Sequence, residues 1–172
     1  MNKSSDPYLW LEDVDSDQSL EWVREQSDKA ESLLAGNPEF KTLEKRLLGQ
    51  LNSSERIPAA AQHGGLLYNF WQDAQNPKGL WRRTSLESYK LPLPEWQTVL
   101  DLDQLSALEG ENWVWKWEQF LEPFHGRVLL FLSRGGKDAG VMREFDVLEK
   151  SFVEGGFYAP ESKGNAAWLD RD

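Results

Sequence analysis

The hydrophobic pattern changes its period near residue 52. Before that point, apolar residues recur every three or four positions, which is typical of one face of a helix. The two series are Leu20, Val23, Ala30 and Leu34, and Phe40, Leu43, Leu47 and Leu51. Beyond that point, short apolar runs alternate with clusters of Gly, Pro, Asn and Asp. The pattern therefore predicts two short helices followed by a β-rich region.

Local signals set the expected helix ends. Asp15, with Gln18 three residues later, resembles a capping box and predicts the start of the first helix. Gly36 stands where a C-terminal cap belongs. Asn37 and Pro38 then predict the N-cap and first residue of the second helix.

A β-hairpin is the clearest element of the β-rich region. Residues 66–72 and 79–86 are rich in aromatic and large apolar side chains, which fit a pleated and packed surface. Residues 73–78 between them include Asn76 and Pro77, which favour a turn. Residues 96–100 are expected to form a third strand of the same sheet.

A second run of strands follows a short helix or loop at residues 104–109. Its expected strands are residues 112–118, 127–133, 141–146 and 150–153, and residues 165–169 would begin a further one. Two similar sheets repeating after about 45–50 residues have the spacing of propeller blades.

The expected fold class is therefore mainly β with an N-terminal α-helical segment, a partial β-propeller of about two blades of antiparallel sheet. We expect an N-terminal helical extension over residues 1–52, and two blades with the start of a third over residues 53–172. Two blades alone leave sheet edges uncovered, so we expect either a longer protein or self-association through the exposed edges.

Charge and composition exclude several classes of function. The net charge of −10 disfavours nucleic acid and anionic membranes as partners. The absence of cysteine excludes disulfides, thiolate zinc sites and thiol nucleophiles. The N-terminus lacks the apolar core of a signal peptide, and no stretch approaches the length of a membrane span, so a cytoplasmic location is expected.

Several long segments carry a resemblance to a family. They are DPYLWLEDVDSDQSLEWVREQ, YNFWQDAQNPKGLWRRTSLESY, TVLDLDQL, GENWVWKW and LSRGGKDAGVMREFD. Together they resemble the N-terminal part of bacterial prolyl oligopeptidase family serine peptidases, collinearly over essentially the whole chain. The resemblance implies a helical extension that wraps an α/β-hydrolase domain and a seven-bladed propeller that covers its active site.

The chain departs from the family in one respect. It contains no G-x-S-x-G nucleophile elbow, so no catalytic residue is assigned. The resemblance implies a non-catalytic N-terminal fragment of an endopeptidase that hydrolyses short peptides after proline. Its expected partners are the peptidase domain of the same protein and that enzyme's peptide substrate. The alternative is a free-standing, acidic, Trp-rich binding module for a peptide or protein.

Possible catalytic and metal sites are weak in the sequence. Ser133 precedes a Gly-rich turn, but only His63 and His125 could act as its base, and neither stands in a recognisable motif. Residues 13, 15 and 17 are aspartates that copy the first ligands of a calcium loop, but the required Gly and Glu are missing. These aspartates are therefore interpreted as helix-start carboxylates, and no metal ligand or cofactor site is assigned.

Three further features have structural interpretations. Residues 134–137 (RGGK) lack the ending of a phosphate loop and predict a hairpin turn. Trp113, Trp115 and Trp117 alternate along a strand and are expected to point one way, into a core between sheets. Arg82 and Arg83 are expected either to be solvated or to pair with carboxylates of a neighbouring body.

Overall fold

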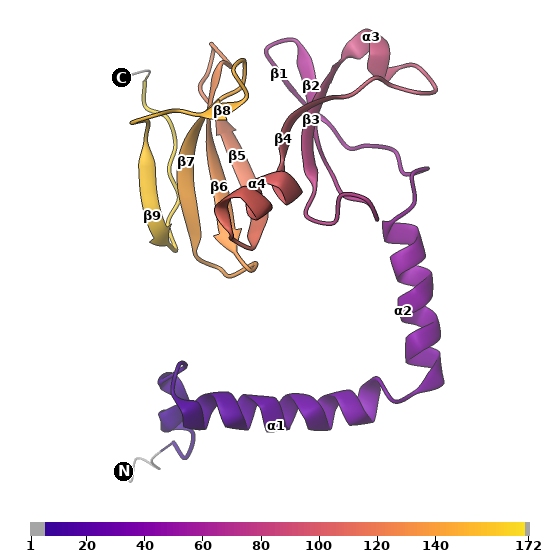
Figure 1. Ribbon diagram of the computed structural model, residues 1–172, viewed down its shortest axis with the longest axis vertical. Coiled ribbons are helices and arrows are strands. Elements are labelled where there is room, and N and C mark those ends of the chain that lie inside the picture. The colour runs from indigo at the N-terminus through magenta and orange to yellow at the C-terminus, as the bar shows by residue number, and fades with distance from the viewer. Residues whose placement is uncertain (1–5, 171–172) are drawn as a thin grey trace, which may run out of the picture. The chain divides into compact units, whose positions relative to one another are not determined.

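The computed structural model describes residues 6–170, which form two units of different character. The N-terminal unit ends at Leu51 and the C-terminal unit begins at Asn52. The first contains a 3-10 helix, η1 (Leu9–Glu12), and two α-helices, α1 (Asp17–Leu34) and α2 (Pro38–Leu51). The second contains all of the described strands (Figure 1). No helix within residues 6–170 combines the length and the apolar character that a bilayer crossing requires.

The two α-helices begin at different kinds of cap. Asn37 Oδ1 accepts a hydrogen bond from the Glu39 amide at 2.9 Å, which confirms the predicted start of α2 at Pro38. The predicted cap of α1 was wrong, because Ser16, not Asp15, accepts from the Ser19 amide. The Ser16 hydroxyl also donates to the Asp13 carbonyl, so it closes the preceding turn as well.

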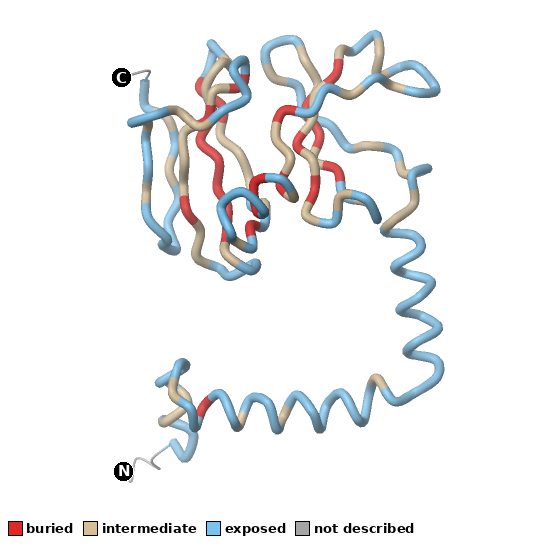
Figure 2. Tube along the Cα trace, viewed as in Figure 1, coloured by how far each residue is buried: buried red, intermediate tan, exposed pale blue. Residues whose placement is uncertain are grey.

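The opening turn packs on the start of α1. The rings of Tyr8 and Trp10 each lie 6.2 Å from the ring of Trp22. The Ser19 hydroxyl donates to the Trp10 carbonyl at 3.3 Å. These contacts bury Ser19 but leave apolar residues of both α-helices exposed. In Figure 2 most of both helices is pale blue, the colour of exposed residues.

Blade 1 is a four-stranded antiparallel sheet in the order β1-β2-β3-β4. Its strands are β1 (Ala61–His63), β2 (Leu66–Trp71), β3 (Leu80–Ser85) and β4 (Gln97–Asp101). The pairing of Leu66 with Ser85 through Trp71 with Leu80 confirms the predicted hairpin. Two short elements were missed: β1, and the single-turn helix α3 (Leu86–Tyr89), which Ser85 caps.

Blade 2 is a second antiparallel sheet in the order β5-β6-β7-β8, with β9 also paired to β7. Its strands are β5 (Trp113–Phe120), β6 (Arg127–Arg134), β7 (Gly140–Asp146), β8 (Ser151–Phe152) and β9 (Tyr158–Ser162). The strand expected at residues 165–169 does not form. Instead, Trp168 Nε1 donates to the Gln119 carbonyl and its ring packs on Phe157. Side-chain contacts of Trp168 therefore attach this segment to blade 2, in place of the backbone hydrogen bonds of a strand.

The two blades share one core, which we call the seam. Its buried members are Tyr68, Trp81, Val99, Phe120, Val128, Leu130, Phe145 and Val147. Helix α4 (Leu102–Glu109) closes one end of the core, where Leu102 and Leu105 pack with Trp113 and Leu132. Burial is concentrated in these strands and in α4 (Figure 2). The predicted fold class, mainly β with an N-terminal α-helical segment and partial blades, is thereby confirmed.

Candidate functional site

Ser133 is a fully buried residue of β6. Its hydroxyl has no hydrogen-bond partner within residues 6–170. A nucleophilic serine requires a general base within hydrogen-bond reach. Within residues 6–170, no histidine or other base lies within hydrogen-bond reach of the Ser133 hydroxyl.

The aspartates near the N-terminus flank a helix start. Asp17 is the first residue of α1, and Asp13 supplies the backbone carbonyl that accepts from Ser16. Residues 6–170 contain one group of three His, Cys, Asp or Glu side chains whose ligand atoms all lie within 4.8 Å of one another. That group does not include these aspartates. Asp13, Asp15 and Asp17 thus lack the convergence that a calcium site needs.

The RGGK segment is a hairpin turn, as predicted. It joins β6 to β7, with Gly135 and Gly136 in left-handed conformations at φ of 67° and 80°. The Gly135 amide donates to the Asn112 carbonyl at 2.7 Å. The Arg134 side chain forms an ion pair with Glu111, and its guanidinium lies 5.0 Å from the centre of the Trp113 ring.

The prediction for the tryptophan row was right for two residues and wrong for the third. Trp115 stacks on Phe70 at 5.0 Å and lies 5.3 Å from Trp81, so it packs between the sheets. A register shift between Trp115 and Trp117 inserts one extra residue in β5. Trp117 therefore points to the other face, where it stacks on Phe131 at 3.5 Å.

Within residues 6–170, neither Arg82 nor Arg83 lies within 4.0 Å of a carboxylate oxygen. The Arg82 guanidinium lies between the rings of Trp71 and Trp96, at 4.3 and 4.4 Å, and its Nε donates to Asn69. Burial lowers the pKa of Arg82 to about 10, so the group stays charged at neutral pH.

Arg83 lies on the opposite side of the strand and reaches the seam. Its Nε donates to Gln97 Oε1 at 2.7 Å, and its Nη1 donates to the Tyr68 hydroxyl and to the Val147 carbonyl of blade 2. Both arginines thus contact aromatic rings or polar groups of the protein, so neither is the freely solvated side chain considered from the sequence.

Blade 1 has a cleft of about 730 Å³ beside Arg82. Trp71, Trp96, Arg56 and Asp73 line it, together with a proline-containing loop at residues 91–94. The Arg56 guanidinium also lies 4.5 Å from the centre of the Trp71 ring, and Asp73 accepts from Trp71 Nε1. The cationic and aromatic groups of the cleft therefore contact one another.

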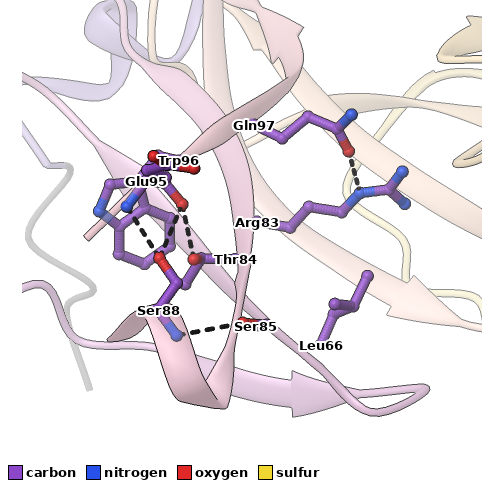
Figure 3. Close-up of a pocket in the computed structure, with 8 residues that line it drawn as sticks. All are labelled: Leu66, Arg83, Thr84, Ser85, Ser88, Glu95, Trp96 and Gln97. Carbon is purple, nitrogen blue, oxygen red and sulfur yellow. Dashed lines mark hydrogen bonds between the residues drawn. The ribbon is translucent and has the colours of Figure 1, made fainter. Parts of the chain in front are cut away.

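A second hollow of blade 1, of about 360 Å³, lies beside α3. Figure 3 shows that its polar groups point to each other. Thr84 Oγ1 donates to the Glu95 carbonyl at 2.6 Å, and the Ser88 amide donates to Ser85 Oγ at 3.1 Å. These bonds hold the connection between β3 and β4 in place.

Besides these two hollows, the structure contains a group of side chains of the kinds that bind metal ions, drawn from both blades. It consists of His63, at the end of β1, with Glu122 and His125 from the turn between β5 and β6; we call it the His–Glu–His cluster. His125 Nε2 lies 3.2 Å from Glu122 Oε2, and His63 Nδ1 lies 3.8 Å from Glu122 Oε1. Burial lowers the pKa of His63, and the negative charge of Glu122 opposes that shift.

Phe120 contacts both imidazoles, since the His125 ring lies 6.4 Å from it in an edge arrangement. The His63 ring stacks on Phe120 at 4.0 Å and meets the edge of Tyr68 at 5.9 Å. The His125 amide donates to the Leu121 carbonyl at 2.8 Å. His63 and His125 are far apart in the sequence and share no motif spacing, so only the folded structure reveals their proximity.

Comparison with known proteins agrees with the fold. Residues 1–172 match the family model described as the prolyl oligopeptidase N-terminal β-propeller domain. An uncharacterized peptidase of Sinorhizobium fredii is 38% identical over 98% of this chain, and one of Rickettsia prowazekii is 30% identical over 95%. A solved structure of a post-proline cleaving enzyme from Rickettsia typhi has a TM-score of 0.77 and 34% identity over 87% of this chain.

Each of these proteins is much longer than the matched region. The chain spans 23% and 24% of the two curated peptidases and 22% of the solved enzyme. A structure of oligopeptidase B from Leishmania major, 14% identical with a TM-score of 0.55, shares the fold over 85% of this chain and 20% of its own length.

Proposed function

Since this chain belongs to the family of prolyl oligopeptidase N-terminal β-propeller domains, we propose that it is the non-catalytic opening part of a serine peptidase that hydrolyses short peptides after proline. The observation that carries the proposal is the likeness to the post-proline cleaving enzyme of Rickettsia typhi, at 34% identity and a TM-score of 0.77. That likeness covers 87% of the chain.

The two blades would form part of a wall that restricts access to the active site. Their shared core supports this role, because a continuous seam of buried aromatic and aliphatic residues makes adjacent blades move together. Trp81, which is 1% exposed, contacts both Trp115 and Phe145 of blade 2. A rigid wall of this kind admits flexible peptides and excludes folded proteins.

The helical unit would dock on the peptidase domain. The apolar stripe of α2 is exposed at Phe40, Leu43, Leu47 and Leu51. Helices of this length gain most of their stability from packing an apolar face against another body. We propose that the peptidase domain of the same protein is that body.

The test is made on the complete open reading frame that contains these residues. We expect it to continue through further blades to a G-x-S-x-G segment. Its purified product should cleave a blocked Gly-Pro reporter at least tenfold faster than the matched Gly-Ala reporter, and a serine-directed phosphonate should stop the reaction. The 172-residue chain alone should turn over neither reporter.

Access is tested separately by substrate size. The full-length enzyme should cleave a short proline-containing peptide and leave the same sequence intact within a folded protein. Equal cleavage of the two would refute the access role. Phosphonate-sensitive turnover by the 172-residue chain, or a reading frame that lacks the nucleophile segment, would refute the assignment to a peptidase.

A further inference from the structure

We propose that the His–Glu–His cluster binds a divalent transition-metal ion, with Zn²⁺ as the best-suited ion, and that the bound ion links blade 1 to blade 2. Both histidines of the chain lie in this cluster. Among residues 6–170 it is the one group of three ligand-type side chains that the fold brings within 4.8 Å.

The donor atoms are close to the spacing that zinc requires. Zinc–ligand bonds of about 2.0–2.1 Å in a tetrahedron place the ligand atoms about 3.3 Å apart. The separation of 3.2 Å between His125 Nε2 and Glu122 Oε2 meets this spacing, and that of 3.8 Å between His63 Nδ1 and Glu122 Oε1 exceeds it. Small rotations of the side chains would bring all three donors onto one ion.

The His63 ring and the His125 backbone are held before any ion arrives. His63 is fixed by its stack on Phe120. His125 has a left-handed backbone, at φ of 52°. Gly64 approaches it so closely that a Cβ added to Gly64 would lie 3.1 Å from the Cβ of His125. The β1–β2 turn thus rests on His125, and a ligand pair from two blades is preorganised. Preorganised ligands lose less conformational entropy on binding.

The ligand set and the solvent exposure indicate the class of ion. Imidazole nitrogen favours zinc and its first-row neighbours over Mg²⁺ and Ca²⁺, which prefer oxygen. Glu122 is 61% exposed at its side chain, whereas the two imidazoles are 24% and 23% exposed. Water can therefore complete the coordination from the Glu122 side, which gives three protein ligands and one open position.

An ion at this place would join elements that belong to different blades. His63 ends an edge strand of blade 1, and the other two ligands lie in a turn of blade 2. Since an ion that binds only the folded chain stabilises it by mass action, zinc should raise the thermal midpoint of the chain.

The experiment uses the 172-residue chain without a histidine tag. Equilibrium dialysis should show one Zn²⁺ per chain, half-saturated at micromolar free zinc or below. Co²⁺ in place of Zn²⁺ should give the visible absorption bands of a tetrahedral site. Zinc, but not Mg²⁺, should raise the thermal midpoint, and a chelator should reverse the rise.

Three substitutions remove one ligand each with little disturbance to the fold. H63F keeps an aromatic ring on Phe120, H125N keeps a residue that tolerates the left-handed backbone, and E122Q keeps the side-chain shape. Each should weaken zinc binding at least tenfold and abolish the midpoint rise. E149Q, at an exposed carboxylate outside the cluster, is the matched control and should bind zinc as the parent does.

Two results would overturn the proposal. One is a folded parent chain, by near-ultraviolet circular dichroism, that binds no zinc at tens of micromolar. The other is zinc binding that all three variants retain at parental affinity, which would assign the ion to surface carboxylates and leave the cluster as a hydrogen-bonded His–Glu contact.

Discussion

Ser133 and Glu118 of blade 2 place polar groups in the interior without full compensation. The Ser133 hydroxyl has no partner within the described residues, and the cost of such a neutral group is about 1–3 kcal/mol. Glu118 lies opposite Leu130 of the seam, and burial raises the pKa of its carboxyl. Its own backbone hydrogen bond opposes that rise in pKa only in part. The fold therefore opposes ionisation of the Glu118 carboxyl.

The raised pKa of Glu118 predicts a pH-dependent effect on stability. The folded chain holds the Glu118 proton at pH values where the unfolded chain has released it, so this group lowers stability as pH rises from 4.5 through its folded pKa. Glu118→Gln removes the effect. Its free energy of unfolding should exceed that of the parent at pH 7, and the difference should shrink toward pH 4.

Urea unfolding followed by tryptophan fluorescence at several pH values measures this difference. Glu149→Gln, at an exposed carboxylate, is the control and should show no such pH dependence. Parallel stability curves for the parent and Glu118→Gln would contradict the prediction.

At the scale of elements, α4 shows how a short helix is held between the blades. Asp101 Oδ1 accepts from the Gln104 amide at 2.9 Å, and Gly110 ends the helix with φ of 66°. The helix buries Leu102 completely and Leu105 almost completely against blade 2. Eight residues are too few for a stable isolated helix, so the cap and the packing sustain it together.

Removal of that cap gives a test at this scale. Asp101→Ala should lower the free energy of unfolding by about 1 kcal/mol, because an orphan amide loses its acceptor. Asp101→Asn retains a capping oxygen and should stay close to the parent. Equal losses for the two variants in urea unfolding would mean that the carboxylate charge, and not the cap, is what matters.

For the whole molecule, exposed apolar surface is the dominant feature of the helical unit. Leu43 and Leu47 of α2 are 51% and 47% exposed, and both belong to one helical stripe. Blade 2 also ends in the exposed strand β9. Exposed stripes and sheet edges of this kind favour association.

We therefore expect the 172-residue chain to self-associate at high concentration. The double substitution Leu43→Glu and Leu47→Glu should reduce the mean mass in light scattering, since it places charge on the apolar stripe. Glu44→Gln, on the same helix, is the control and should leave the mass unchanged. A parent chain that stays monomeric at high concentration would refute the expectation.

Much of this protein follows from short stretches of its sequence. The strands on either side of residues 73–78, the hairpin turn at Gly135 and Gly136, and the start of α2 at Pro38 depend on local conformational preferences. These preferences act over a few residues, so they can be read directly. The collinear match to a family likewise required no coordinates, and the family model covering residues 1–172 confirms it.

Other features depend on contacts between distant parts of the chain, and only the tertiary structure decided them. The bulge that turns Trp117 away from Trp115 follows from pairing with β6, and the burial of Glu118 follows from the seam. The meeting of His63 with His125 requires two blades to pack face to face. No local preference encodes such contacts, because their free energy exists only when residues remote in sequence are already adjacent in space.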